Sequence, residues 1–194
     1  MQAPREAHWN AVLQVPRYLK GHPGQDILFR HNSPLVLLGY CDSDWATCPN
    51  TRRSVTGYFV TLDGSPISWR TNKQATVSRS SVEAEYRSMA TLTCELLWLR
   101  SLFSTLRIKL PPLKLFCDNK AALHIASNPV FHEHTKHIEL DCHFIRDHVK
   151  SGAISPSYMP TTKQLADIFT KVLGTSQFHH LLVKMGIFDP HAPS

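Results

Sequence analysis

The sequence has no C-x-x-C pair, and its five cysteines are scattered along the 194 residues. This usage argues against a disulfide framework and against a cysteine zinc site, and it favours a reducing compartment. Residues 1–6 lack the apolar core of a secretory signal. No apolar run approaches the roughly 20 residues that span a bilayer. We therefore expect a soluble, intracellular protein, cytoplasmic or nuclear, with no membrane partner.

Internal repeats and low-complexity segments are also missing, and the sequence is poor in acidic residues. There are 15 acidic side chains against 21 lysines and arginines, which gives a net charge of +6 with histidine neutral. A basic balance is compatible with a polyanionic partner but does not identify one. With 42% hydrophobic and 19% charged residues, the chain is predicted to be globular and long enough for one sizeable core.

Hydrophobic patterns predict a leader followed by elements in the order βββαβαβα. Strands are expected at 35–41, at 54–62, and from 67–70 with a possible return at 75–77, then at 113–117 and 154–159. Helices are expected at 81–106, 121–125, 136–149, from a capping box at 161–164, and at 176–184. This order predicts an α/β fold with one five-stranded mixed sheet, an antiparallel meander plus parallel strands, flanked by helices.

The chain is expected to divide into three parts. Residues 1–34 are interpreted as a leader from a preceding module, 35–187 as the main domain, and 188–194 as a tail. The leader carries a helical pattern over 7–20. Pro16 lies inside that pattern, where proline costs about 3 kcal/mol or breaks the helix.

One carboxylate falls on a helix face that should be buried. Apolar residues recur from Val82 and Met89 to Phe103 at helical spacing, and Glu85 takes the position between the first two. A buried carboxylate is costly unless it is paired or holds a metal. Glu83 has a simpler explanation, because Ser80 and Glu83 form a capping box in which Glu83 is expected to be solvated. For Glu85 the alternative is a salt-bridged acid at the edge of the core.

Three aspartates could meet Glu85. Asp42 and Asp118 each end a predicted strand, and Asp167 lies early in a predicted helix. Ligands bind beyond the carboxyl ends of strands in α/β sheets. Four converging acids need cations, and oxygen ligands suit Mg²⁺, with Mn²⁺ as a possible substitute. Two such ions could clamp the attacking and leaving oxygens of a phosphodiester.

Each aspartate also has a purely structural explanation. Asp42 or its neighbour Asp44 could close a strand, and the sequence does not decide which of the two is a ligand. Asp118 could cap the following helix. Asp167 could form a surface ion pair with Lys171, four residues on. The joint placement of all four acids on suitably ordered elements favours the metal site.

Basic residues near the predicted strand ends are candidate contacts to a nucleic-acid backbone, with one tryptophan as an apolar platform. These candidates are Arg52, Arg53, Trp69, Arg70, Lys73 and Lys120. A solvated basic surface is the alternative. A further cluster, His132, His134, His137, Cys142 and His143, makes a zinc site conceivable, but no second ligand pair at finger spacing exists. A loop that touches phosphates, or a helix start packed on the sheet, is the favoured interpretation of this cluster.

Seven motifs occur in an order that resembles the ribonuclease H domain of copia-type retrotransposon Pol polyproteins. They lie at Tyr40–Ala46, Arg52–Tyr58, Ile67–Trp69, Ser80–Tyr86, Cys117–Ala122, Thr135–Ile138 and Gln164–Lys171. The leader resembles the end of the preceding reverse-transcriptase and connection region.

The resemblance implies cleavage of the RNA strand of an RNA:DNA hybrid with two Mg²⁺ ions held by Asp42, Glu85, Asp118 and Asp167. It favours Asp42 over Asp44 as the first metal ligand and adds Lys136 and His137 to the nucleic-acid contacts. It also implies the reverse-transcriptase domain as a possible partner. The expected location is a cytoplasmic virus-like particle or the nucleus. The loop at Tyr158–Thr161 lacks the histidine of cellular ribonucleases H. Rival hypotheses are a non-catalytic nucleic-acid-binding remnant and a transposase or integrase domain of the same fold.

Overall fold

A computed structural model of the chain describes residues 3–29, 35–128 and 138–190. Its main sheet consists of β2 (Leu37–Asp44), β3 (Val55–Leu62), β4 (Ser65–Lys73), β5 (Leu113–Cys117) and β6 (Ile154–Tyr158). The helices of the described residues are α1 (Glu6–Gly21), α2 (Ser81–Thr105), α3 (Lys120–Ser127), α4 (Glu139–Lys150), α5 (Thr175–Lys184) and the short 3₁₀ helices η2 (Thr161–Lys163) and η3 (Leu165–Phe169). A separate pair of short strands, β1 (Asp26–Ile27) and β7 (Ile187–Phe188), joins the two ends of the fold.

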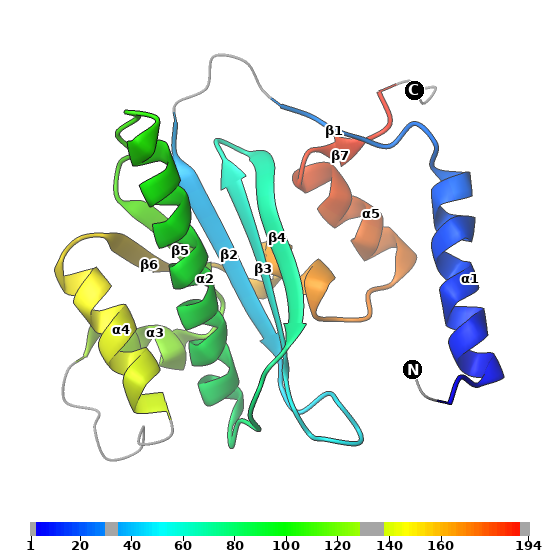
Figure 1. The fold of residues 1–194 in the computed structure, drawn as a ribbon, viewed down its shortest axis with the longest axis horizontal. Helices are drawn as coiled ribbons and strands as arrows, with labels where there is room; N and C mark the ends of the chain where they lie inside the picture. The colour runs from blue at the N-terminus through cyan, green and yellow to red at the C-terminus, as the bar shows by residue number, and fades with distance from the viewer. Residues whose placement is uncertain (1–2, 30–34, 129–137, 191–194) are drawn as a thin grey trace.

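The main sheet has the strand order β4-β3-β2-β5-β6. β2, β3 and β4 form an antiparallel meander, whereas β5 pairs parallel with both β2 and β6. β2 therefore lies at the centre, with its carboxyl end beside that of β5. The predicted five-stranded mixed sheet flanked by helices is confirmed (Figure 1).

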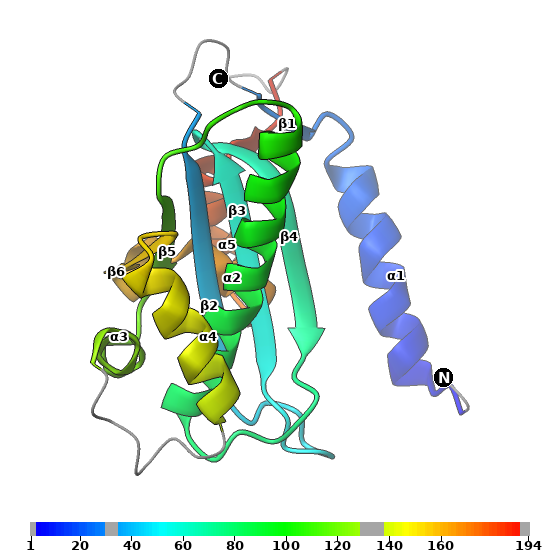
Figure 2. The same ribbon diagram turned by 60° about the vertical axis from the view of Figure 1, so that its left-hand side comes forward.

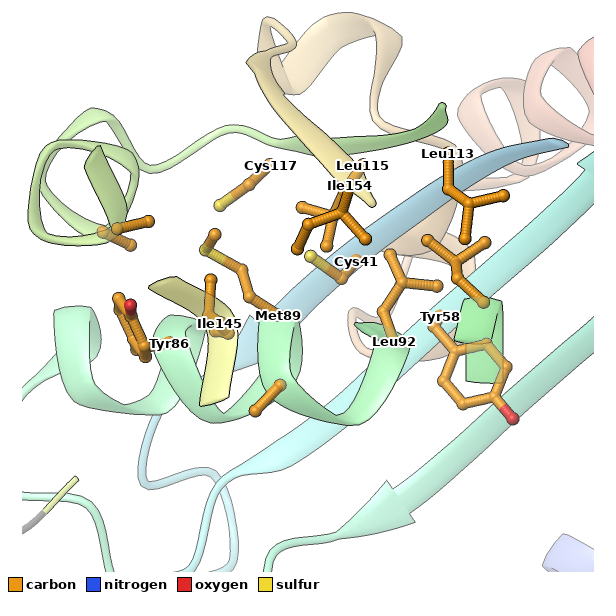
Figure 3. Packing of buried hydrophobic residues seen from close by; sticks show 14 of the residues in the cluster. Cys41, Tyr58, Tyr86, Met89, Leu92, Leu113, Leu115, Cys117, Ile145 and Ile154 are labelled. Carbon is orange, nitrogen blue, oxygen red and sulfur yellow. The ribbon is translucent and has the colours of Figure 1, made fainter. Parts of the chain in front are cut away.

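Helices cover the sheet on both faces (Figure 2). On one face α2 packs across the strands together with α3 and α4, and their apolar side chains form the larger core. Met89 and Leu92 of α2, Leu115 of β5 and Ile145 of α4 are fully buried there (Figure 3). On the other face η3 and α5 close a smaller core around Phe59 of β3.

The helix α2 begins where the sequence predicts. Ser80 is its N-cap and accepts a hydrogen bond from the Glu83 amide at 3.1 Å, while Glu83 pairs with Arg87 at 2.7 Å. The Ser80 cap is therefore present, but Glu83 Oε2 accepts from the Arg79 amide at 2.8 Å rather than from the Ser80 amide, so the predicted capping box is only half formed. Glu83 is also only 7% exposed, so the expectation of a solvated Glu83 is wrong.

The N-terminal segment is held near the C-terminal end of the chain. β1 pairs antiparallel with β7, and the Tyr18 ring of α1 packs edge-on against Phe178 of α5. Pro16 lies inside α1 without breaking it, and no side chain of α1 is buried. The proposed division at residue 34 stays a prediction. None of the helices in the described ranges has the length and hydropathy needed to cross a membrane.

Two segments differ from the sequence prediction. The third strand ends at Lys73 and does not return at 75–77. The predicted helix after Thr161 is instead the pair of short helices η2 and η3. The buried Gln164 side chain explains the break between them, because it donates to the Cys41 carbonyl at 2.9 Å and accepts from the Ala166 amide. Tertiary docking on β2 thus replaces a continuous helix.

Candidate active site

The carboxyl end of β2 is the centre of the site. Asp42 is 1% exposed, and its backbone carbonyl accepts a hydrogen bond from Ser88 Oγ of α2 at 2.9 Å. The neighbouring Ser43 amide donates to Glu85 Oε1 at 3.0 Å. Since side chains alternate along a strand, Cys41 faces the α2 core while Asp42 faces η3. One short stretch of strand therefore contacts the elements that carry Glu85 and Asp167.

Glu85 lies in the first turns of α2 and is 6% exposed, on the face that the apolar stripe predicts. Its Oε2 lies 3.8 Å from Cys117 Sγ. The pKa of Glu85 is raised to about 10, mainly by burial and additionally by the nearby Cys117, Asp42 and Asp118. Without a cation, Glu85 therefore holds a proton at neutral pH.

Asp118 follows the last residue of β5, and its Oδ2 accepts a hydrogen bond from Thr161 Oγ1 at 2.7 Å. The helix cap of α3 is the next residue, because Asn119 Oδ1 accepts from the Ala122 amide at 3.0 Å. The alternative in which Asp118 caps this helix is therefore wrong. The Asp118 side chain instead faces the other acids.

Asp167 lies on η3 and is 1% exposed. Burial raises the pKa of Asp167 to about 6, although a hydrogen bond from Lys171 opposes this increase. The Asp167–Lys171 pair exists at 2.8 Å, but Lys171 also contacts Asp42 at 3.0 Å. The pair is therefore part of the acidic cluster and is not the plain surface ion pair that the sequence allowed.

Gly57 of β3, the register partner of Asp42, allows η3 to lie close to the sheet. A Cβ atom at this position would come within 2.7 Å of Thr170 Cγ2 and 2.8 Å of Phe169 Cβ. Such distances are shorter than van der Waals contact, so any larger side chain must push η3 away. Glycine at residue 57 is therefore a condition for bringing Asp167 to the end of β2.

We expect Gly57→Ala to lower the free energy of unfolding by about 1–3 kcal/mol, the usual cost of overpacking. Urea unfolding followed by circular dichroism measures this change. Gly21→Ala is the matched control, because a Cβ atom there meets nothing within 4 Å and the residue lies at the end of helix α1, where alanine is tolerated. Equal stability of the two variants would show that η3 does not depend on the close approach.

The four acids converge in two overlapping groups. Ligand atoms of Asp42, Asp118 and Asp167 lie within 4.8 Å of one another, and so do those of Glu85, Cys117 and Asp118. Asp118 belongs to both groups. Asp44, two residues beyond Asp42, belongs to neither group within the described part of the chain.

The chemistry of this cluster fits divalent cations. Among the described residues, Lys171 is the one basic side chain that forms a salt bridge with any of the four acids. Burial is the main cause of the raised pKa values of Glu85 and Asp167, and the neighbouring carboxyl groups add to it. Carboxylate oxygens are the ligands that Mg²⁺ and Mn²⁺ prefer, so these residues can hold such ions.

The predicted nucleic-acid contacts come from several elements of the fold. Five of them are exposed basic residues: Arg52, Arg53, Arg70, Lys73 and Lys120. Lys120 lies over the Tyr158 ring at 4.7 Å. Lys136 and His137, with His132 and His134, lie outside the described residues.

Trp69 and Arg70 are neighbours on β4, so their side chains point to opposite faces of the sheet. Trp69 is 51% exposed. It lines an apolar cavity of about 330 Å³ together with Phe169 and Phe178. Trp69 and Arg70 therefore lie on different surfaces, and the role of Trp69 as a platform for nucleic acid stays a prediction.

Sequence reasoning missed several polar side chains that hold the acids in place. Thr161 bonds Asp118, Thr170 Oγ1 donates to Asp42 Oδ2, and Gln164 bonds the backbone beside Asp42. Gln164 and Thr170 lie in the same motif as Asp167. Their place in this motif was the sequence signal that could have indicated a role in the site. Their partners are more than 120 positions away in the sequence, so spacing could not reveal their roles.

Comparisons with known proteins agree with this fold and family. No protein-family model matches the chain. The retrovirus-related Pol polyproteins from transposons RE2 and RE1 of Arabidopsis thaliana are 45% and 43% identical over 189 residues, covering 96% of this chain. The chain spans 13% of the length of each polyprotein.

Solved structures share the fold at low sequence identity. LC11-RNase H1, isolated from compost, has a TM-score of 0.52 at 15% identity and covers 71% of this chain and 94% of its own. The same enzyme in complex with an RNA/DNA hybrid has a TM-score of 0.52 at 13% identity and covers 69% and 93%. The sheet order and these structures give the chain a ribonuclease H-like fold, and over 96% of its length the chain is similar to a segment of the retrovirus-related Pol polyproteins of copia-type transposons.

Proposed function

We propose that this chain is a metal-dependent endoribonuclease that hydrolyses the RNA strand of RNA:DNA hybrids during retrotransposon reverse transcription. The observation that carries the proposal is the pair of acidic groups that share Asp118 at the carboxyl ends of β2 and β5. Two groups of candidate ligand atoms, in which all but Cys117 Sγ are carboxylate oxygens, suit two-ion phosphodiester hydrolysis. The hybrid-bound structure of LC11-RNase H1 supports the choice of substrate.

In this proposal Asp42, Glu85, Asp118 and Asp167 are the metal ligands. Bound Mg²⁺ ions would supply an activated water and stabilise the charge that develops on the departing 3′-oxygen. Glu85 must release its proton when it becomes a ligand, because a carboxylic acid is a poor donor to a cation. Thr161 and Gln164 keep Asp118 and the end of β2 in position by hydrogen bonds.

The remaining predicted contacts and partners belong to the same proposal. Exposed Arg52, Arg53 and Lys120 would contact backbone phosphates of a hybrid that is recognised by its shape. Residues 1–34 would belong to the end of the reverse-transcriptase and connection region, and the reverse-transcriptase domain of the same polyprotein would be the protein partner. We further propose that the domain acts inside the cell, in a virus-like particle or the nucleus.

Cleavage of a hybrid with labelled RNA tests the proposed function. We expect RNA cleavage in Mg²⁺ or Mn²⁺, none in EDTA, and little cleavage of duplex DNA or duplex RNA of the same sequence. Binding of the hybrid without cleavage in either ion would indicate a non-catalytic remnant instead. Preferential cutting of duplex DNA would indicate a transposase-like or integrase-like activity.

A further inference from the structure

The side chain of Lys171 lies between two of the acids that would hold a metal. Its Nζ donates to Asp167 Oδ1 at 2.8 Å and to Asp42 Oδ1 at 3.0 Å. The two aspartate side chains are 2% exposed, whereas the lysine side chain is 33% exposed. The Lys171 ammonium therefore bridges the carboxylates of Asp42 on β2 and Asp167 on η3.

Both oxygens of Asp42 are engaged in this arrangement. Lys171 bonds Oδ1, and the Thr170 hydroxyl bonds Oδ2. Each carboxylate oxygen has two lone pairs, so these bonds leave one on each Asp42 oxygen for a divalent ion. The Lys171 ammonium and a divalent ion at the same oxygens would, however, repel each other strongly. We therefore expect a divalent ion that loads this group to displace Lys171.

We propose that Lys171 is a built-in counter-ion that competes with a divalent cation for Asp42 and Asp167, so that metal binding expels its ammonium from the cluster. The inference rests on the proposed metal site. It makes Lys171 a positioning residue that holds the metal-free site together and sets the ion concentration at which that site fills.

The position of Lys171 suits such a displacement. It lies beyond η3, after the C-cap Thr170, and a third of its side chain is already exposed. A lysine has a flexible four-carbon stem, so the ammonium can turn to solvent while the backbone of η3 stays on the sheet. Asp167 lies on η3, and the bonds of the Gln164 side chain to the Cys41 carbonyl and the Ala166 amide hold the start of η3 without involving the lysine.

Metal titration of a Lys171→Met variant tests the competition. We expect the apparent dissociation constant for Mn²⁺, measured by calorimetry on the full chain, to fall roughly tenfold, which is about 1.4 kcal/mol. We also expect the variant to melt at a lower temperature in EDTA and to show a larger rise in melting temperature on adding Mn²⁺. Lys184→Met, a change at an exposed residue of α5, is the control and should leave both values unchanged.

The outcomes separate this inference from the proposed function. Wild-type protein that binds Mn²⁺ and cleaves hybrids, with equal affinity in Lys171→Met, would overturn the inference alone. Weaker binding by the variant would overturn it too, because Lys171 would then assemble the site for the metal. Wild-type protein that takes up no divalent ion would overturn both proposals.

A second measurement needs no variant. Reductive methylation of the wild-type chain, read by mass spectrometry, should modify Lys171 several-fold faster in Mn²⁺ than in EDTA, because the ammonium leaves its carboxylates. Lys184 in the same sample should react at the same rate in both. Equal rates for Lys171 with and without Mn²⁺, under conditions where calorimetry shows binding, would overturn the competition.

Discussion

Replacing Asp118 with asparagine is expected to lower the rate of hybrid cleavage by on the order of a thousandfold. Asp118 is the acid common to both groups of ligand atoms, so its loss weakens the binding of either ion. Asparagine keeps the size of the side chain and can still accept the hydrogen bond from Thr161. The fold should therefore survive, and single-turnover cleavage in Mg²⁺ with a melting curve in EDTA measures both effects.

Asp44→Asn is the matched control for this prediction. Asp44 ends the same strand as Asp42 and lies outside both groups of converging acids in the described residues. We expect it to retain cleavage within a few-fold of the wild type. Loss of activity in Asp44→Asn with retention in Asp118→Asn would show that the acids near β2 bind metal in a different combination.

Glu85→Gln is expected to abolish cleavage and, at the same time, to stabilise the metal-free protein. Burial raises the pKa of Glu85 from 4.5 to about 10, so the folded chain binds one more proton than the unfolded chain between these values. The free energy of unfolding therefore falls as pH rises through this window. Glutamine does not titrate, so the variant does not lose stability in this way. We expect its free energy of unfolding at pH 7 to exceed that of the wild type by on the order of 1–3 kcal/mol.

Urea unfolding in EDTA at pH 5 and pH 8 checks the sign of this effect. The advantage of Glu85→Gln over the wild type should be small at pH 5 and larger at pH 8. Glu95→Gln is the control, because Glu95 lies on the same helix and accepts a hydrogen bond from Ser68 that glutamine can also accept. It should change stability by no more than about 0.5 kcal/mol at either pH. An equal loss of stability for Glu85→Gln at both pH values would contradict the buried, protonated carboxyl.

The sheet and its long helix could be predicted because their patterns are local. Apolar runs bounded by turn residues mark β2 and β5, and the stripe from Val82 onward marks the buried face of α2. The same stripe placed Glu85 on the inner face. Strand ends placed Asp42 and Asp118 at one edge of the sheet, because parallel strands end on the same side.

The region after β6 could not be predicted because its form depends on distant partners. The capping-box pattern at Thr161 favoured a helix, but the Gln164 side chain bonds the Cys41 carbonyl of β2 instead. Lys171 follows Asp167 at helical spacing, and only the folded chain shows that Asp42 shares its ammonium. The four-residue spacing predicts the contact of Lys171 with Asp167, but it contains no information about the contact with Asp42.

The pairing of β1 with β7 has a consequence for how the chain is made. Ile27 finds its partner Ile187 roughly 160 positions later, and at about 5–20 residues per second the ribosome needs roughly 8–32 s to synthesise that stretch. Throughout this interval the apolar segment Ile27–Phe29 has no strand beside it. Contacts of such long sequence separation also form slowly, so the strand pair that joins the two ends of the fold is completed late in synthesis.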